Sequence, residues 1–132
     1  MKTLSFLAVP LVVIAVFAAT PICAETAPAR VEITLANFSF TPSAIQLHGG
    51  QQVTLHFVNN GSGGHDFTAP EFFKTAMMDA AIRAKLGKKG KVSLESGTSM
   101  DVTLTPKVGS YKAKCSHFLH AGFGMTGTIS VN

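Results

Sequence analysis

The chain has 132 residues, which is enough for one domain and little more. Hydrophobic residues make up 46% of it and charged residues only 14%, a composition that can build a core and excludes an intrinsically disordered chain. Two cysteines are too few for a small domain held together by disulfides. The net charge of +4 is too weak, by itself, to indicate a nucleic-acid partner.

The N-terminal segment resembles a targeting signal. Lys2 precedes an apolar run over residues 4–19, and the small residue Ala24 stands at a plausible cleavage point. A run of about 16 residues is short for a membrane span of about 20, although an uncleaved anchor is the alternative. We therefore expect a cleaved signal peptide over residues 1–24, a mature domain over residues 25–132 and a periplasmic location.

Cleavage after Ala24 would remove Cys23 and leave Cys115 as the one cysteine of the exported protein. A single thiol in an oxidising compartment requires an explanation, such as intermolecular pairing, a free reactive group or a metal.

Short segments with alternating apolar and polar residues follow one another along the mature chain. They predict half-buried strands, separated by turn residues such as the glycine-rich run over 61–64. The expected strands cover residues 31–35, 45–47, 53–57, 65–69, 91–95, 100–105, 109–115 and 125–131. About eight such strands predict an all-β sandwich or small barrel.

One helical insertion is expected around residues 71–86. Thr68 and Glu71 have the spacing of a capping box, Pro70 suits a first helical turn, and Gly87 is a typical C-terminal stop. The residues expected along one apolar stripe are Phe73, Met77, Ala80 and Ala84. The lysines over 85–91 complement the helix dipole and could also steer an acidic partner.

The residues that indicate chemistry lie near the C-terminus. Cys115 has the same strand parity as core residues, and Met125 has the same parity as Ile129 on the next strand. The intervening loop therefore holds a thiolate, an imidazole (His117 or His120) and a thioether within reach of one point. His65, after the glycine-rich loop, is a suitable second imidazole. Two histidines, a cysteine and a weak axial methionine are typical of a copper electron-transfer site.

Two segments carry a resemblance to a known family: Asn-Asn-Gly-Ser-Gly-Gly-His-Asp-Phe over 59–67, and Tyr-Lys-Ala-Lys-Cys-Ser-His-Phe-Leu-His-Ala-Gly-Phe-Gly-Met-Thr-Gly-Thr-Ile over 111–129. The chain resembles the cupredoxins, the small blue copper proteins that include plastocyanin, pseudoazurin and azurin. The resemblance implies a Greek-key β-sandwich and one type 1 copper ion. By the same resemblance, the four copper ligands are His65, Cys115, His120 and Met125.

The spacing of the loop histidine departs from the family. Plastocyanin and pseudoazurin place it two residues closer to the cysteine than His120 lies to Cys115. His117 is closer still to Cys115, but it would leave seven residues before Met125, whereas His120 leaves four, as in plastocyanin. This favours His120. The helical insertion has no counterpart in plastocyanin, but azurin has one in the middle of its chain.

The resemblance also implies roles for residues around the ligands. Asn60 would tie the two ligand loops together, and the side chain of Asp66 would reach Ser116, while its backbone N–H would donate to the Cys115 sulfur. The Gly64 carbonyl would be a weak axial contact. Asp66 stands where the family carries an asparagine, so we expect a lower reduction potential than an asparagine would give.

The function that follows is an electron carrier rather than an enzyme. We expect an apolar docking surface around the edge of His120, a transient redox partner, no nucleic-acid partner, no membrane span after cleavage and a monomer. The docking residues are Phe118, Leu119, Ala121 and Phe123. The alternatives are a copper-sequestering protein of copper resistance or delivery, which the additional histidines and methionines permit, and a metal-free interaction module.

Overall fold

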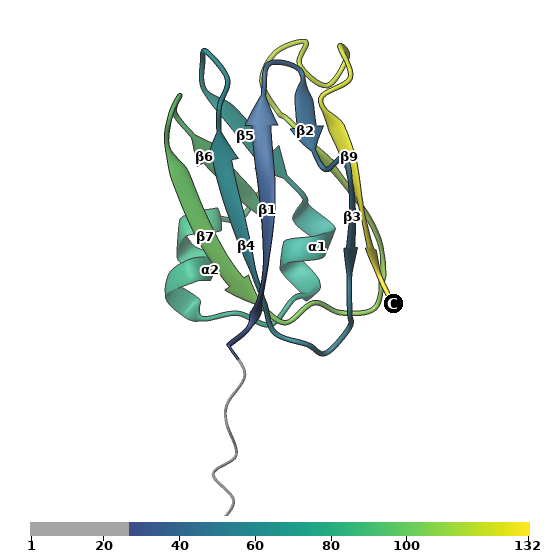
Figure 1. Cartoon of the computed structure of the whole chain (residues 1–132). Coiled ribbons are helices and arrows are strands. Elements are labelled where there is room, and N and C mark those ends of the chain that lie inside the picture. Colours follow the sequence, from purple (N-terminus) through teal and green to yellow (C-terminus); the bar gives the residue numbers. More distant parts are fainter. Residues whose placement is uncertain (1–26) are drawn as a thin grey trace, which may run out of the picture.

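The computed structural model describes residues 27–132, and the expected signal peptide lies outside them. Two sheets pack face to face (Figure 1). The first sheet has the order β2-β1-β4-β7. Its strands are β1 (Ala29–Ala36), β2 (Ser39–Thr41), β4 (Val53–Asn59) and β7 (Ser99–Leu104).

The second sheet has the order β3-β9-β8-β5-β6. Its strands are β3 (Ala44–Leu47), β5 (His65–Thr68), β6 (Lys91–Leu94), β8 (Gly109–Lys114) and β9 (Thr126–Val131). The pairs β1–β4 and β3–β9 are parallel, and the other pairs are antiparallel. The expected all-β sandwich is confirmed.

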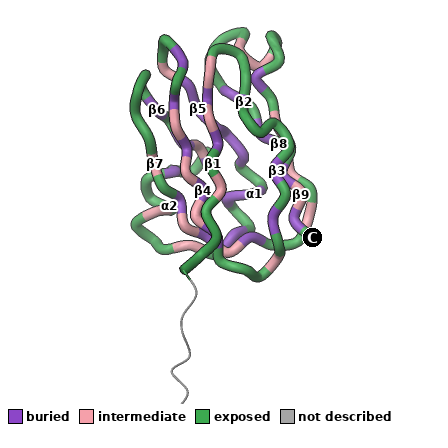
Figure 2. The backbone as a smooth tube through the Cα atoms, viewed as in Figure 1, coloured by how far each residue is buried: buried purple, intermediate pink, exposed green. Residues whose placement is uncertain are grey.

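The core lies between the two sheets, where alternate residues of most strands are buried and all four residues of β5 are (Figure 2). In β4, for example, Val53, Leu55 and Phe57 point inward while the residues between them are half-buried. This is the period-two pattern that the sequence predicts for a strand with one face on a core. Phe67 of β5 packs its ring against those of Phe57 and Phe40, and so joins the two sheets.

The structure has one strand more than the sequence predicted. The additional strand is β2, which forms because the chain turns at Asn37 and Phe38 and returns antiparallel to β1. Phe38 has a positive φ of 63°, which closes this turn. The turn places Asn37 and Phe38 at the same end of the sandwich as the β4–β5 and β8–β9 connections (Figure 1).

The expected single helix is two short ones, α1 (Pro70–Thr75) and α2 (Ala80–Leu86). The chain is extended at Ala76, and Met77 forms a β-bridge with Thr105. This long-range bridge, with backbone hydrogen bonds of 2.9 and 2.8 Å, outweighs the local helical preference. No helix in the described part of the chain is long and apolar enough to cross a membrane.

The expected helix start and apolar stripe were also wrong in detail. Ala69 caps α1 without a side-chain hydrogen bond, because the Thr68 hydroxyl donates to Asp66 instead. Met77 is 70% exposed, and Ala80 and Ala84 are exposed as well. The buried residues of the two helices are Phe72, Phe73 and Leu86. Pro70 in the first turn and Gly87 as the C-cap are as expected.

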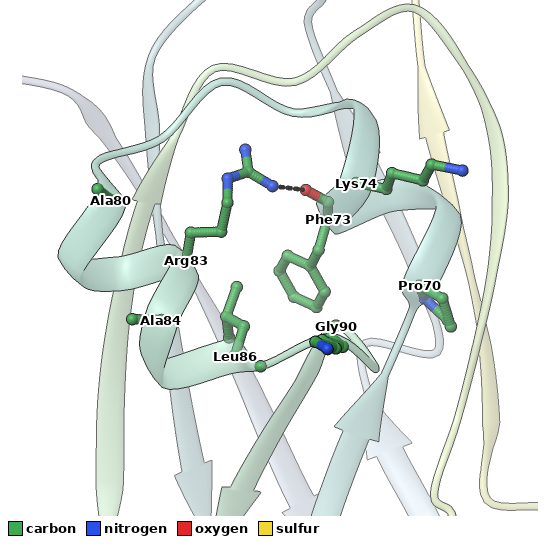
Figure 3. Close-up of a pocket in the computed structure, with 10 residues that line it drawn as sticks. Pro70, Phe73, Lys74, Ala80, Arg83, Ala84, Leu86 and Gly90 are labelled. Carbon is green, nitrogen blue, oxygen red and sulfur yellow. Dashed lines mark hydrogen bonds between the residues drawn. The ribbon is translucent and has the colours of Figure 1, made fainter.

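A pocket of about 500 Å³ lies between α1 and α2 (Figure 3). Phe73 and Leu86 line it, and the Arg83 guanidinium donates to the carbonyl oxygens of Phe73 and Ala76 at 3.1 and 2.8 Å. These bonds satisfy carbonyls at the end of α1 that have no partner within the helix. The pocket is lined by residues of the segment 70–90 and by none of the expected copper ligands.

Asp101 is the centre of a polar cluster that joins β1, β4 and β7. Its carboxylate lies 2.6 Å from His56 Nδ1 and accepts from Arg30 at 3.2 Å. The hydrogen bond from His56, and then that from Arg30, hold the pKa of Asp101 below its usual value. The cluster is therefore more favourable when the carboxylate is ionised.

We predict that Asp101→Asn lowers the free energy of unfolding by less than about 1 kcal/mol at pH 7, since the pairs are exposed. A group with a lowered pKa in the folded state stabilises the fold above its unfolded pKa of about 3.9. That contribution disappears as the pH falls through the folded pKa. Urea unfolding of the wild type and of Asp101→Asn at pH 7 and pH 2.5 checks this prediction. If the difference between their free energies of unfolding were the same at both pH values, the prediction would be contradicted.

Candidate metal centre

The β4–β5 and β8–β9 connections lie at one end of the sandwich and carry the candidate ligands (Figure 1). His65 is the first residue of β5, Cys115 directly follows β8, and Met125 directly precedes β9. The ligand loop over residues 115–125 is closed by backbone hydrogen bonds: Cys115 N–H donates to the Met125 carbonyl, and Met125 N–H donates to the His120 carbonyl, both at 3.0 Å. The strand ends therefore fix the relative positions of these residues.

His65, Cys115 and His120 form a compact group of metal-binding side chains. One donor atom from each lies within 4.8 Å of the others, and the Cys115 sulfur is 3.5 Å from His120 Nδ1. His65 and Cys115 are buried and His120 is half-buried. The structure thus brings together three of the four ligands that the sequence predicted. Met125 is completely buried at the base of the same loop, and its role as a ligand stays a prediction.

The Nδ1 atom of His65 indicates that the group of His65, Cys115 and His120 is suited to bind a metal ion. It is buried and has no hydrogen-bond partner among the described residues. Buried polar atoms are nearly always paired, so an unpaired imidazole nitrogen beside a thiol and a second imidazole fits a metal ion. Burial lowers the pKa of His65, and the neighbouring His120 and His117 lower it further, against the opposing effect of Asp66. The neutral imidazole, which is the form that binds a metal, is therefore favoured.

His117 lies beside this group rather than in it. Its ring stacks on that of His120 with centroids 5.4 Å apart, its side chain is 46% exposed, and its Nε2 lies 3.6 Å from the Asp66 carboxylate. The compact group contains His120 and not His117. This geometry supports the preference for His120 as the ligand.

Asp66 links the two ligand segments. Its Oδ1 accepts from the Ser116 N–H at 2.9 Å and from the Thr68 hydroxyl at 2.7 Å, and its Oδ2 accepts from the Ser116 hydroxyl at 2.7 Å. The contact between Asp66 and Ser116 agrees with the sequence prediction. Three hydrogen bonds therefore hold this buried side chain between β5 and the ligand loop.

Asn60 is exposed, and its expected role between the two ligand loops stays a prediction. The amide that organises the glycine-rich loop belongs to the buried Asn59. Asn59 donates to the carbonyls of Gly63 and Leu94 at 2.8 and 2.9 Å, and accepts from Gly61 N–H at 2.9 Å. Asn59 continues the inward parity of Phe57, so the strand alternation could have identified it.

Gly64, directly before His65, is half-buried, and its expected role as a weak axial contact stays a prediction.

The sequence did not indicate Asn37, which contacts the site from the β1–β2 turn. Its Oδ1 lies 3.2 Å from His65 Nε2. Nothing in the local pattern connects two residues that are 28 positions apart, because only the fold brings this turn to the ligand loops.

An apolar surface surrounds the edge of His120. Three of the predicted docking residues are exposed: Phe118 by 87%, Leu119 by 54% and Phe123 by 66%. Ala121 is half-buried. Phe38, which was not predicted, meets His120 edge-on at 5.2 Å and Phe123 at 5.5 Å. Exposed aromatic side chains gathered around one partly exposed imidazole are typical of a protein contact site.

The Cupredoxin-like domain family matches residues 7–131. Because the match covers almost the whole chain, the protein belongs to the cupredoxin-like family. Membership confirms the family and fold predicted from the sequence, and the donor set agrees with the predicted cofactor, one type 1 copper ion. None of the curated protein sequences matches the chain.

Solved structures with a similar fold include two auracyanins. The sodium-dithionite-reduced auracyanin of the photosynthetic bacterium Roseiflexus castenholzii is 19% identical, with 81% of this chain and 99% of that chain covered and a TM-score of 0.59. Auracyanin A of Chloroflexus aurantiacus, described as a "blue" copper protein, is 20% identical, with 80% and 100% covered and a TM-score of 0.57. A multicopper oxidase is 16% identical, with 78% and 41% covered and a TM-score of 0.58. At these identities the similarities show the fold alone.

Proposed function

We propose that this protein is a type 1 copper protein that carries single electrons between redox partners. The observation that carries the proposal is the compact group of His65, Cys115 and His120, with the buried Nδ1 of His65 left unpaired. Two imidazoles and one thiolate, with a methionine as weak axial ligand, are the donors of copper electron-transfer sites. His65, Cys115, His120 and Met125 would hold the ion.

Bound copper would supply a Cu(II)/Cu(I) couple, and the protein would supply a rigid, shielded setting for it. The hydrogen bonds from Cys115 N–H and Met125 N–H close the ligand loop, and Asp66 joins that loop to β5. A fixed donor set means that little moves when one electron is gained or lost. Cys115 and Met125 are buried, so water is kept from them, while the half-buried His120 reaches the surface.

The apolar surface supports a transient partner that docks at His120. We propose that Phe118, Leu119, Ala121 and Phe123, together with Phe38, contact the partner. Small interfaces of this kind suit short-lived electron-transfer encounters. The lysines over 85–91 belong to the opposite half of the domain and would steer an acidic partner at long range.

The location and maturation of the protein are part of the same proposal. Export and cleavage after Ala24 would deliver residues 25–132 to the periplasm as a monomer. Mass spectrometry of the protein purified from the periplasm tests this cleavage directly. A protein that retains its N-terminal residues in the membrane fraction would contradict it.

Electron exchange separates the carrier from the copper-sequestering alternative. The copper-loaded protein is reduced by ascorbate and reoxidised by ferricyanide while its visible spectrum and bound copper are followed. A carrier cycles repeatedly and keeps its copper in both oxidation states. Release of copper on reduction, or absence of reoxidation, would favour sequestration.

The charge of Asp66 provides a prediction about the reduction potential. An anionic carboxylate near the ligands stabilises Cu(II) over Cu(I), so Asp66→Asn is expected to raise the potential by about 60 mV, equivalent to about 1.4 kcal/mol for one electron. Asparagine retains an oxygen acceptor for Ser116 N–H, and the Ser116 hydroxyl can reverse its hydrogen bond. Thr68→Val is the matched control, since it removes a hydrogen bond to Asp66 without changing the charge. Cyclic voltammetry measures the shift, and an unchanged or lowered potential in Asp66→Asn would refute the argument.

A further inference from the structure

The amide of Asn37 is oriented by its contacts with Ser62. Ser62 N–H donates to Asn37 Oδ1 at 3.1 Å, and Asn37 Nδ2 donates to the Ser62 hydroxyl oxygen at 3.1 Å. A backbone N–H can only donate, so the atom that faces it must be the amide oxygen. This settles the orientation of an amide whose two ends are otherwise hard to distinguish.

The same oxygen lies 3.2 Å from His65 Nε2. Because an amide oxygen can only accept, Nε2 must carry the proton of the neutral imidazole, and Nδ1 must present its lone pair. Nδ1 is buried and unpaired, and His65 belongs to the compact group with Cys115 and His120. The hydrogen bond at Nε2 therefore determines which nitrogen of His65 has a free lone pair for a metal.

Gly61 provides the space for this contact. A Cβ added at Gly61 would lie 2.5 Å from His65 Nε2 and 2.9 Å from Asn37 Oδ1. Both distances are too short for unbonded atoms, so any side chain at this position would displace the ring or the amide. The close approach of the ring to the backbone requires glycine here.

The β1–β2 turn that carries Asn37 is itself held at the site. Phe38, at a positive φ of 63°, packs edge-on against His120 and Phe123. The turn thus contacts both imidazoles of the group: Asn37 by a hydrogen bond to one, and Phe38 by its ring on the other.

We propose that Asn37 is a positioning residue that fixes the tautomer and orientation of His65, with Gly61 providing the space, so that Nδ1 is available to the metal. The proposal deepens the proposed copper function and rests on it. Partners of this kind orient metal-binding histidines, and their loss reduces metal affinity by about 10- to 100-fold.

The first test uses the metal-free protein, so that it does not depend on copper. Long-range ¹H–¹⁵N NMR spectra of the histidine side chains identify the protonated nitrogen of His65 at pH 8, and solvent exchange of that proton reports its hydrogen bond. We expect a protected proton on Nε2 in the wild type and in Asn37→Asp, which retains an oxygen acceptor. Asn37→Leu, of similar size but without an acceptor, and Gly61→Ala should both lose that protection.

The second test measures Cu(II) affinity by competition with a chelator. Asn37→Leu and Gly61→Ala are expected to bind about 10- to 100-fold more weakly than the wild type, and Asn37→Asp within about threefold of it. The two weakened variants lose the same hydrogen bond by different means, so one remains informative if the other does not fold.

Several results would overturn the proposal. These are a wild-type His65 protonated on Nδ1, a protected Nε2 proton that persists in Asn37→Leu, or equal losses of affinity in Asn37→Asp and Asn37→Leu. A wild type that binds copper without a thiolate band would instead contradict the proposed function. The NMR result on the metal-free protein would still decide the role of Asn37 in that case.

Discussion

Cys115→Ser is expected to abolish the intense visible absorption of the copper-loaded protein. That band arises from charge transfer between a cysteine thiolate and Cu(II), and Cys115 is the one cysteine among the described residues. Its sulfur lies 3.5 Å from His120 Nδ1 at the centre of the candidate site. A serine hydroxyl does not ionise at neutral pH and is a much poorer ligand for copper. We therefore expect the band to be lost and the Cu(II) affinity to fall by more than 100-fold.

Met125→Leu is the matched control for this experiment. It removes the second sulfur of the site but fills a similar volume at a completely buried position. Since the thiolate is retained, the variant should keep an intense band, although its wavelength and potential will change. A Cys115→Ser protein that keeps the band, or a Met125→Leu protein that loses it entirely, would contradict the assignment.

Phe67→Ala is expected to cause the largest loss of stability. Phe67 is completely buried, and its ring packs against Phe57 at 5.0 Å, Phe40 at 5.1 Å and Phe73 at 6.4 Å, measured between centroids. It therefore connects both sheets with α1. Removing a buried phenylalanine typically costs about 3–5 kcal/mol, because apolar burial is lost and a cavity remains. A domain with a total stability of about 5–15 kcal/mol would lose a large fraction of it.

Denaturant unfolding of the metal-free proteins measures this effect without a contribution from copper. Phe118→Ala is the control, because Phe118 is 87% exposed and its truncation should change stability by no more than about 0.5 kcal/mol. A loss below about 1 kcal/mol for Phe67→Ala would mean that the contact between the sheets does not depend on this ring.

The sequence predicted those parts of the fold that depend on local alternation. The sequences of β1, β4, β7 and β8 alternate with period two, and this alternation predicted them as strands. The loop position of Cys115 and the glycine-rich turn before His65 indicated a metal site, and the resemblance to the cupredoxins implied that His120 completes the group. The start of β5 and the end of β8 bring these side chains to the same end of the sandwich.

The features that the sequence did not predict depend on contacts between distant segments. The β-bridge between Met77 and Thr105 divides the expected helix, and nothing in the local sequence predicts this bridge. Asn37 reaches His65 only because the β1–β2 turn folds against the ligand loops. Asn59 is the exception, since continuing the alternation of β4 by one step would have distinguished it from Asn60.

The most direct test of the copper centre is the visible and electron paramagnetic resonance spectrum of the purified protein over residues 25–132 after addition of one equivalent of Cu(II). The arrangement of His65, Cys115 and His120 predicts an intense thiolate-to-copper band and a small parallel hyperfine splitting, with one copper bound per chain. A pale solution with an ordinary hyperfine splitting would show that copper binds to histidines without the Cys115 thiolate, and would contradict the proposed electron-transfer site.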